Sequence, residues 1–236
     1  MMMSIYMKNI ISHMKKTVLS TCLVVASASI ASAVNVALEF STTEDGFINV
    51  PGISSTDIVD GTGITVTSNN PGGNFANPGT LADGIFGTGF GINSGNGGGL
   101  FRIQIDLGGL FDIDSINTFS VSDGNDRRSN QTFLVFGSAL ANPTAFDELS
   151  SDFESIATVI LDSTDPAITT SGTFGASSIT DIDGSFQTLL FVSEAPDGTE
   201  GTIFREIDVF GTAVPEPSST ALLGLGFLGL ITRRRR

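Results

Sequence analysis

The chain has 236 residues, with 11 basic and 25 acidic side chains, a formal net charge of −14, one histidine, one cysteine, one tyrosine and no tryptophan. Residues 34–217 contain four arginines and no lysine against all twenty-five acids, which gives −21 and excludes nucleic-acid partners, because phosphate contacts need Lys and Arg. The only His, Cys and Tyr precede residue 34, so this part cannot form a disulfide, a Ser-His-Asp triad, a cysteine nucleophile or a His-ligated zinc site.

The first 33 residues are typical of a secretory signal peptide. Two lysines precede an apolar stretch at 18–30, and Ala31 and Ala33 form an A-x-A cleavage site. We expect residues 1–33 to be removed. A lipoprotein is the competing interpretation, but a bulky threonine precedes Cys22 and almost no apolar run comes before it.

The remaining body is predicted to be all-β, because short runs rich in Val, Ile, Thr and Phe are separated by Gly, Asn, Asp and Pro. Only 144–151 has a weak helical pattern. The glycine-rich stretch 68–99 retains Leu81, Ile85, Phe86 and Phe90, which we expect to fold back onto the core. The expected strands are 34–40, 47–50, 63–67, 100–107, 113–121, 132–137, 156–161, 186–192 and 202–210.

The clearest alternation lies in residues 100–107. Four apolar side chains, at 101, 103, 105 and 107, alternate with Arg102, Gln104 and Asp106, so one face of this strand is expected on the core and the other toward solvent. A Gly108-Gly109 pair is then expected to turn the chain into the next strand.

The segments IQIDLG (103–108) and REIDVFG (205–211), in this order and separation, resemble the discoidin or F5/8 type C domain, a galactose-binding-like family. The resemblance implies a discoidin-like jelly-roll β-sandwich over residues 81–213. It also implies that 34–40 pairs beside the last strand. Residues 34–80 would supply this strand and a linker, with an extra hairpin as one alternative for 42–67.

The same resemblance implies a structural calcium ion. Members of the family commonly hold it with an Asp-Gly pair, a Ser or Thr five residues later and a Glu in the last strand, positions that Asp83, Thr88 and Glu206 occupy here. Calcium prefers several hard oxygen ligands, and a glycine-rich loop lets backbone carbonyls supply some of them. The alternative is that Asp83 only caps a turn and Glu206 is a solvated strand residue.

Arg128 is the candidate ligand-binding residue that the resemblance implies, since an arginine before this strand often lies near the family's ligand face. The alternative is that it pairs with a carboxylate, because acids greatly outnumber arginines here. The body lacks the Trp or Tyr on which sugar-binding members stack a pyranose ring. Fold and ligand are therefore separate predictions.

The last 23 residues, 214–236, combine a Pro215-Glu216-Pro217 motif, an apolar run at 221–231 and four arginines. The run is shorter than the roughly 20 residues of a stable membrane span. This order resembles the PEP-CTERM sorting signal of Gram-negative bacteria, which implies export, transient membrane anchoring through a short C-terminal helix, and processing by an exosortase. An anchor that is never cut is the alternative. The basic residues of this signal are Arg233, Arg234, Arg235 and Arg236.

Together these features predict a non-enzymatic protein of the cell surface or extracellular matrix, associated with exopolysaccharide and stabilised by Ca²⁺. The alternative is a secreted carbohydrate-active enzyme, or its accessory domain, that works through two carboxylates. Two acids about 5 to 10 Å apart in a deep cleft would favour the enzyme.

Overall fold

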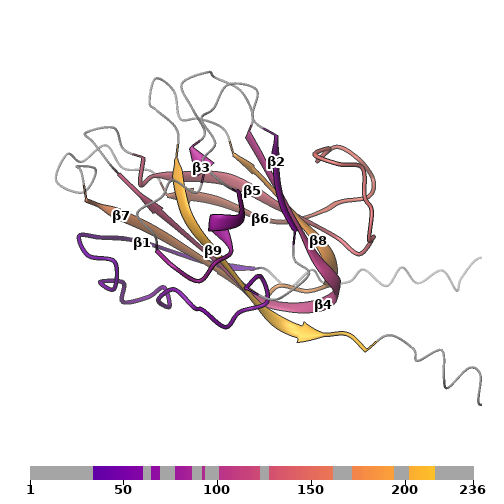
Figure 1. Cartoon of the computed structure of the whole chain (residues 1–236), viewed down its shortest axis with the longest axis horizontal. Helices are drawn as coiled ribbons and strands as arrows, with labels where there is room; N and C mark the ends of the chain where they lie inside the picture. Colours follow the sequence, from indigo (N-terminus) through magenta and orange to yellow (C-terminus); the bar gives the residue numbers. More distant parts are fainter. Residues whose placement is uncertain are drawn as a thin grey trace, which may run out of the picture. The chain divides into compact units, whose positions relative to one another are not determined.

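The computed structural model describes residues 34–60, 65–69, 78–86, 92–93, 101–122, 128–161, 172–193 and 202–215. Within these ranges the chain forms nine strands and one short 3-10 helix, which confirms the all-β prediction (Figure 1). No helix in the same ranges is long and apolar enough to cross a membrane. The elements are β1 (Asn35–Ser41), β2 (Thr65–Asn69), η1 (Pro78–Leu81), β3 (Ile92–Asn93), β4 (Phe101–Val121), β5 (Gln131–Ser138), β6 (Glu154–Leu161), β7 (Phe174–Thr180), β8 (Ser185–Ser193) and β9 (Ile203–Ala213).

The long strand β4 takes part in two layers (Figure 1). Its first half pairs with β2 and β8, and β8 continues to β5 and β6. Its second half pairs antiparallel with β7 and β9, and these continue to β1 and β3. Apolar side chains from both halves of β4 share one buried cluster with residues of β5, β7, β8 and β9. The two layers therefore enclose one core, as expected for a β-sandwich.

The Gly108-Gly109 pair does not end the strand, so the prediction of a turn between two strands is wrong. Gly108 has a φ of 70° and donates its N–H to Asp106 Oδ1 at 2.9 Å. The β4–β8 register shifts between Asp106 and Phe111. The glycines thus form an irregularity that redirects one continuous strand from the first layer to the second.

The N-terminal strand is also placed differently from the prediction. Strand β1 pairs with β7, with Asn35 opposite Thr180 and Ser41 opposite Phe174, and not with the last strand. Strand β7 was missed in the sequence because its residues, FGASSIT, are mostly small and polar. The expected strand at 47–50 is absent from the structure, and β2 pairs with β4 rather than with a hairpin partner in 42–60.

Residues 42–57 instead run over the outer face of the second layer as irregular chain, and Ile58 and Val59 then join the main core cluster. Phe47, Val50 and Ile53 form a small apolar cluster there with Phe119 of β4 and with Ala176 of β7. Leu81 and Phe86 pack inward as expected, whereas Ile85 is 61% exposed, against the prediction. Phe90 lies outside the described residues.

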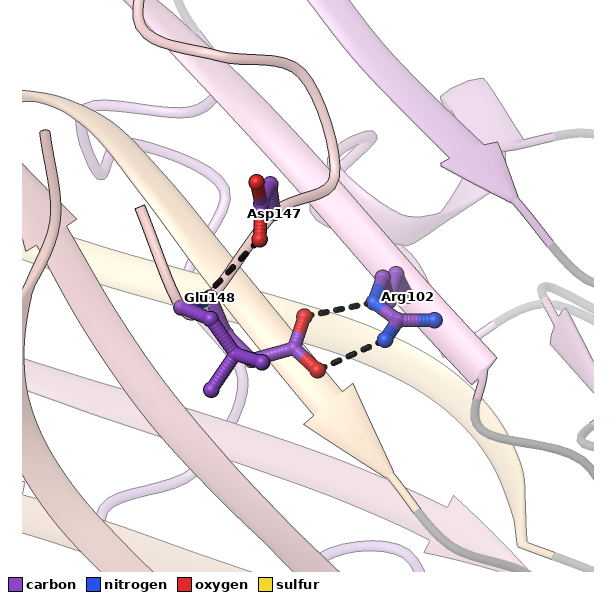
Figure 2. A network of polar contacts seen from close by, with 4 residues as sticks. Arg102, Asp147 and Glu148 are labelled. Atoms are coloured by element: carbon purple, nitrogen blue, oxygen red, sulfur yellow. Dashed lines mark hydrogen bonds and ion pairs between the residues drawn. The ribbon is translucent and has the colours of Figure 1, made fainter. Parts of the chain in front are cut away.

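The loop after β5 covers the outer face of the first layer, where solvent was expected. Arg102 donates from Nε and Nη2 to the Glu148 carboxylate at 2.7 and 2.6 Å, with Asp147 beside them (Figure 2). Phe146 N–H donates to Gln104 Oε1 at 3.0 Å. The weak helix predicted at 144–151 is wrong: this loop consists of turns, and Phe146 has a positive φ of 55°.

Candidate metal site

Glu206 lies in the middle of β9, on the face that the N-terminal segment covers. Its register partner is Phe119, which belongs to the apolar cluster beneath that segment. Glu206 is 0% exposed, and neither carboxylate oxygen has a hydrogen-bond partner in the described part of the chain. The alternative of a solvated strand residue is therefore wrong.

Burial raises the pKa of Glu206 to about 9, because an ionised carboxylate loses its hydration there. The next causes, in order, are the negative charges of Asp208, Asp83, Asp60 and Asp57. A carboxyl group so placed is either protonated or compensated by a cation.

Residues 54–58, which precede β2, dock on β9 and bring Asp57 close to Asp208. Ile58 N–H donates to Val209 O at 2.8 Å, which places Asp57 against the strand. Asp57 Oδ1 accepts from the N–H of Val59 at 2.8 Å and of Val209 at 3.2 Å, while Asp208 Oδ2 accepts from Ser54 N–H at 2.9 Å. Burial raises the pKa of Asp57 to about 6 and that of Asp208 to about 7, and neighbouring carboxylates add to both shifts.

The predicted Asp83-Gly84 turn approaches the same place. Gly84 has a φ of 68°, and a Cβ added to it would lie 2.7 Å from Ser55 Cα and 3.0 Å from Asp60 Oδ2. Only glycine accommodates both this conformation and this contact. Asp83 is exposed, and its Oδ1 accepts from Ile85 N–H at 3.1 Å, so it does cap a turn as the alternative proposed.

We give the name acid cluster to Glu206 and the four carboxylates whose negative charges raise its pKa. Two of them, Asp83 and Glu206, were predicted from the sequence, and the other three were not. The alternation of REID on one strand was the available signal for Asp208, because residues two apart share a face. Nothing comparable marked the two acids before β2, which were assigned to a linker. The acid cluster comprises Asp57, Asp60, Asp83, Glu206 and Asp208.

Within the described ranges, no three His, Cys, Asp or Glu side chains lie close enough together to hold a metal ion by themselves. A cation at the acid cluster therefore also needs other oxygen ligands, such as backbone carbonyls, an amide or water. Thr88, the third predicted ligand, lies outside the described residues.

The other predicted site residues are spread over the chain. Arg128 is half-buried at the turn before β5, and its backbone carbonyl accepts from Ile203 N–H at 3.0 Å, beside the start of β9. Pro215 is exposed at the end of the described chain. The cleavage-site alanines 31 and 33, residues 216 and 217, and the four C-terminal arginines lie outside the described residues.

Several solved structures resemble the chain. One is the C-terminal domain of a chitobiase from Bacteroides fragilis, with 18% identity, coverage of 69% of this chain and 99% of that one, and a TM-score of 0.43. A chitosan-binding module from Paenibacillus sp. IK-5 has 12% identity, 66% and 98% coverage and a TM-score of 0.44. A family 32 carbohydrate-binding module from Clostridium perfringens, solved with galactose, has 12% identity, 62% and 92% coverage and a TM-score of 0.44.

Sequence comparison addresses the C-terminal segment. No curated protein matches the chain. Residues 213–236 match the model of the PEP-CTERM protein-sorting motif, which confirms the prediction for this segment.

Proposed function

We propose that the chain is an exported protein of the cell surface or extracellular matrix of a Gram-negative bacterium, sorted by an exosortase and stabilised by calcium. The observation that carries the proposal is the PEP-CTERM motif at 213–236, which follows directly on the last strand of a β-sandwich. A processing enzyme in the membrane would recognise Pro215-Glu216-Pro217, and the chain would contact the membrane only through this segment before cleavage.

The acid cluster supports the calcium part of the proposal. The buried Glu206 carboxylate has two unpartnered oxygens within the described chain, and Asp60 has two more. Hard oxygen atoms of this kind are what Ca²⁺ prefers. Asp83 and Glu206 would hold the ion together with backbone carbonyls, and Thr88 is the third ligand expected from the sequence. The bound ion would supply the positive charge that lets these acids stay ionised in the folded protein.

Burial supports a structural role for the ion. Glu206 and Asp208 are both 0% exposed, and residues 54–58 dock on β9 through backbone hydrogen bonds. A glycosidase pair must reach a sugar and a water molecule, so these two acids are not such a pair. We propose a non-enzymatic role for the body, in which it binds or lies in the exopolysaccharide that surrounds a surface protein. Arg128 is our candidate for ligand contact.

Fractionation of the producing cells tests the export part. The parent is expected in the surface or matrix fraction, shortened at its C-terminus, whereas a Glu216→Ala or Pro217→Ala variant should accumulate uncut in the membrane. Equal release of parent and variants would contradict the exosortase assignment.

Co-sedimentation with the matrix polysaccharide tests the binding part. The parent should pellet with the polysaccharide in calcium and less in chelator, and Arg128→Gln should reduce pelleting while Arg102→Gln should not. Polysaccharide hydrolysis by the parent, detected as new reducing ends, would favour the enzyme alternative.

A further inference from the structure

Asn117 is a buried amide in the middle of β4 that the proposed function does not use. It is 1% exposed, and neither its Nδ2 nor its Oδ1 has a hydrogen-bond partner in the described part of the chain. A buried polar group left in this state is strongly unfavourable. The side chain therefore indicates a ligand that the described protein groups do not provide.

The strand register shows where Asn117 points. It lies directly opposite Asp208 on β9, within a regular stretch that runs from Ser115 opposite Phe210 to Phe119 opposite Glu206. Paired residues of antiparallel strands extend from the same face, with Cβ atoms about 4.5–5.5 Å apart. Asn117 thus lies on the face of the acid cluster, beside Asp208.

Two carboxylates on this side of β9 each use one oxygen for backbone hydrogen bonds: Asp208, opposite Asn117, and Asp57, which is bonded to the adjacent Val209. Asp208 Oδ2 accepts from Ser54 N–H, and Asp57 Oδ1 accepts from the N–H groups of Val59 and Val209. The remaining oxygens, Asp208 Oδ1 and Asp57 Oδ2, are buried and unpartnered in the described chain. Backbone donors thus fix both carboxylates while one oxygen of each stays available to a cation.

Burial and charge favour a second ion. Glu206, Asp208 and Asp57 are all buried, and a single Ca²⁺ offsets two of their three negative charges. Uncompensated buried charge is strongly unfavourable, so the remaining carboxylate needs a second cation.

We propose that Asp57, Asp208 and Asn117 bind a second calcium ion through Asp57 Oδ2, Asp208 Oδ1 and Asn117 Oδ1. Two carboxylates and an amide oxygen are a hard ligand set that suits Ca²⁺, with waters or carbonyls completing the shell. The ion ties residues 54–59 to the centres of β4 and β9. This inference depends on the proposed function in one respect, that a first calcium ion binds at Glu206.

The test is the number of calcium ions retained by the full chain, measured by elemental analysis after equilibrium dialysis against buffered Ca²⁺. The parent should bind two ions, and Asp208→Asn and Glu206→Gln one each. Asp208→Asn keeps an oxygen for Ser54 N–H, so it changes charge with little change in shape. Asp112→Asn, an exposed position on β4 away from the acid cluster, is the matched control and should bind two.

The outcomes separate the two assignments. One ion, lost in Glu206→Gln and kept in Asp208→Asn, overturns the second site and leaves the proposed function standing. One ion with the reverse pattern supports the second site and overturns the Glu206 assignment. One ion lost in both variants overturns the second site, and no bound calcium overturns both.

Asn117→Asp tests the site with a variant that gains a calcium ligand instead of losing one. A third carboxylate should lower the melting temperature in chelator and tighten calcium binding at least tenfold, so that the shift on adding Ca²⁺ exceeds that of the parent. A purely structural Asn117 would lower the melting temperature equally with and without calcium, and this result would overturn the proposal.

Discussion

Replacing Glu206 by Gln should stabilise the protein when calcium is removed. Gln has nearly the same shape as Glu but carries no charge. Because burial and four neighbouring acids raise the pKa of Glu206 to about 9, the folded protein must take up a proton there at neutral pH or bury a charge. The variant avoids both.

The magnitude follows from the pKa values. Glu206 has an ordinary value of 4.5, and each pH unit above it costs about 1.4 kcal/mol until the folded pKa is reached. At pH 7 the penalty is on the order of 3 kcal/mol, and at pH 5 it is below about 1 kcal/mol. The stability of the parent in chelator should therefore fall as pH rises from 5 to 8, and that of Glu206→Gln should fall less.

Urea unfolding of the full chain at pH 5 and pH 7, in chelator and in calcium, measures this difference. In calcium at a thousandfold excess over Kd the order should reverse at both pH values, since binding to the native state then adds about 4.1 kcal/mol, more than the penalty at pH 7, and the variant lacks this gain at Glu206. Glu154→Gln, at an exposed position on β6, is the control and should show neither effect. If Glu206→Gln is less stable than the parent at pH 7 in chelator, the account of the buried carboxylate is wrong.

Three further substitutions test the packing around the site. Gly84→Ala should destabilise the fold by about 1–3 kcal/mol in thermal unfolding, because its φ is positive and its Cβ would lie 2.7 Å from Ser55 Cα, and should weaken calcium binding, because the same Cβ would lie 3.0 Å from Asp60 Oδ2; unchanged values would contradict the placement of that turn. Arg102→Leu should cost about 1 kcal/mol at pH 7; since Arg102 lowers the pKa of Glu148 from 4.5, this cost should shrink as pH falls below 4.5 and through the lowered pKa of the folded state, and a cost equal at pH 3 and 7 would argue against the ion pair. Gly137→Ala should lower the free energy of unfolding by about 1–3 kcal/mol, because its Cβ would lie 2.3 Å from the buried ring of Phe186; an equally stable variant would show that the ring moves aside.

The sequence predicted the strands whose pattern reflects burial. The alternation at 101–107 places four apolar side chains in the core as expected, and REIDVFG forms part of the last strand. Strand β7 was not predicted because its Gly, Ala and Ser residues form no apolar pattern in the sequence. They are buried because β7 lies between neighbouring strands. The continuous course of β4 was not predictable either, because a Gly-Gly pair fits a turn and an irregular strand equally well.

The candidate site was predicted only in part for a related reason. Glu206 and the Asp83-Gly84 turn were selected through a family resemblance, and the charge of Asp83 contributes to the raised pKa of Glu206. Asp57 and Asp60 join them because residues 54–59 dock on β9 through backbone hydrogen bonds. Such bonds leave no pattern in the sequence. Asn117 could not be selected from the sequence as a candidate ligand, because its place beside Asp208 depends on the pairing of β4 with β9.

The central claim is that calcium binds at Glu206, and anomalous X-ray diffraction from crystals of the protein grown in calcium tests it most directly. The account predicts an anomalous peak about 2.3–2.6 Å from a Glu206 carboxylate oxygen. A map without such a peak, in which the Glu206 carboxyl hydrogen-bonds to protein groups instead, would contradict it.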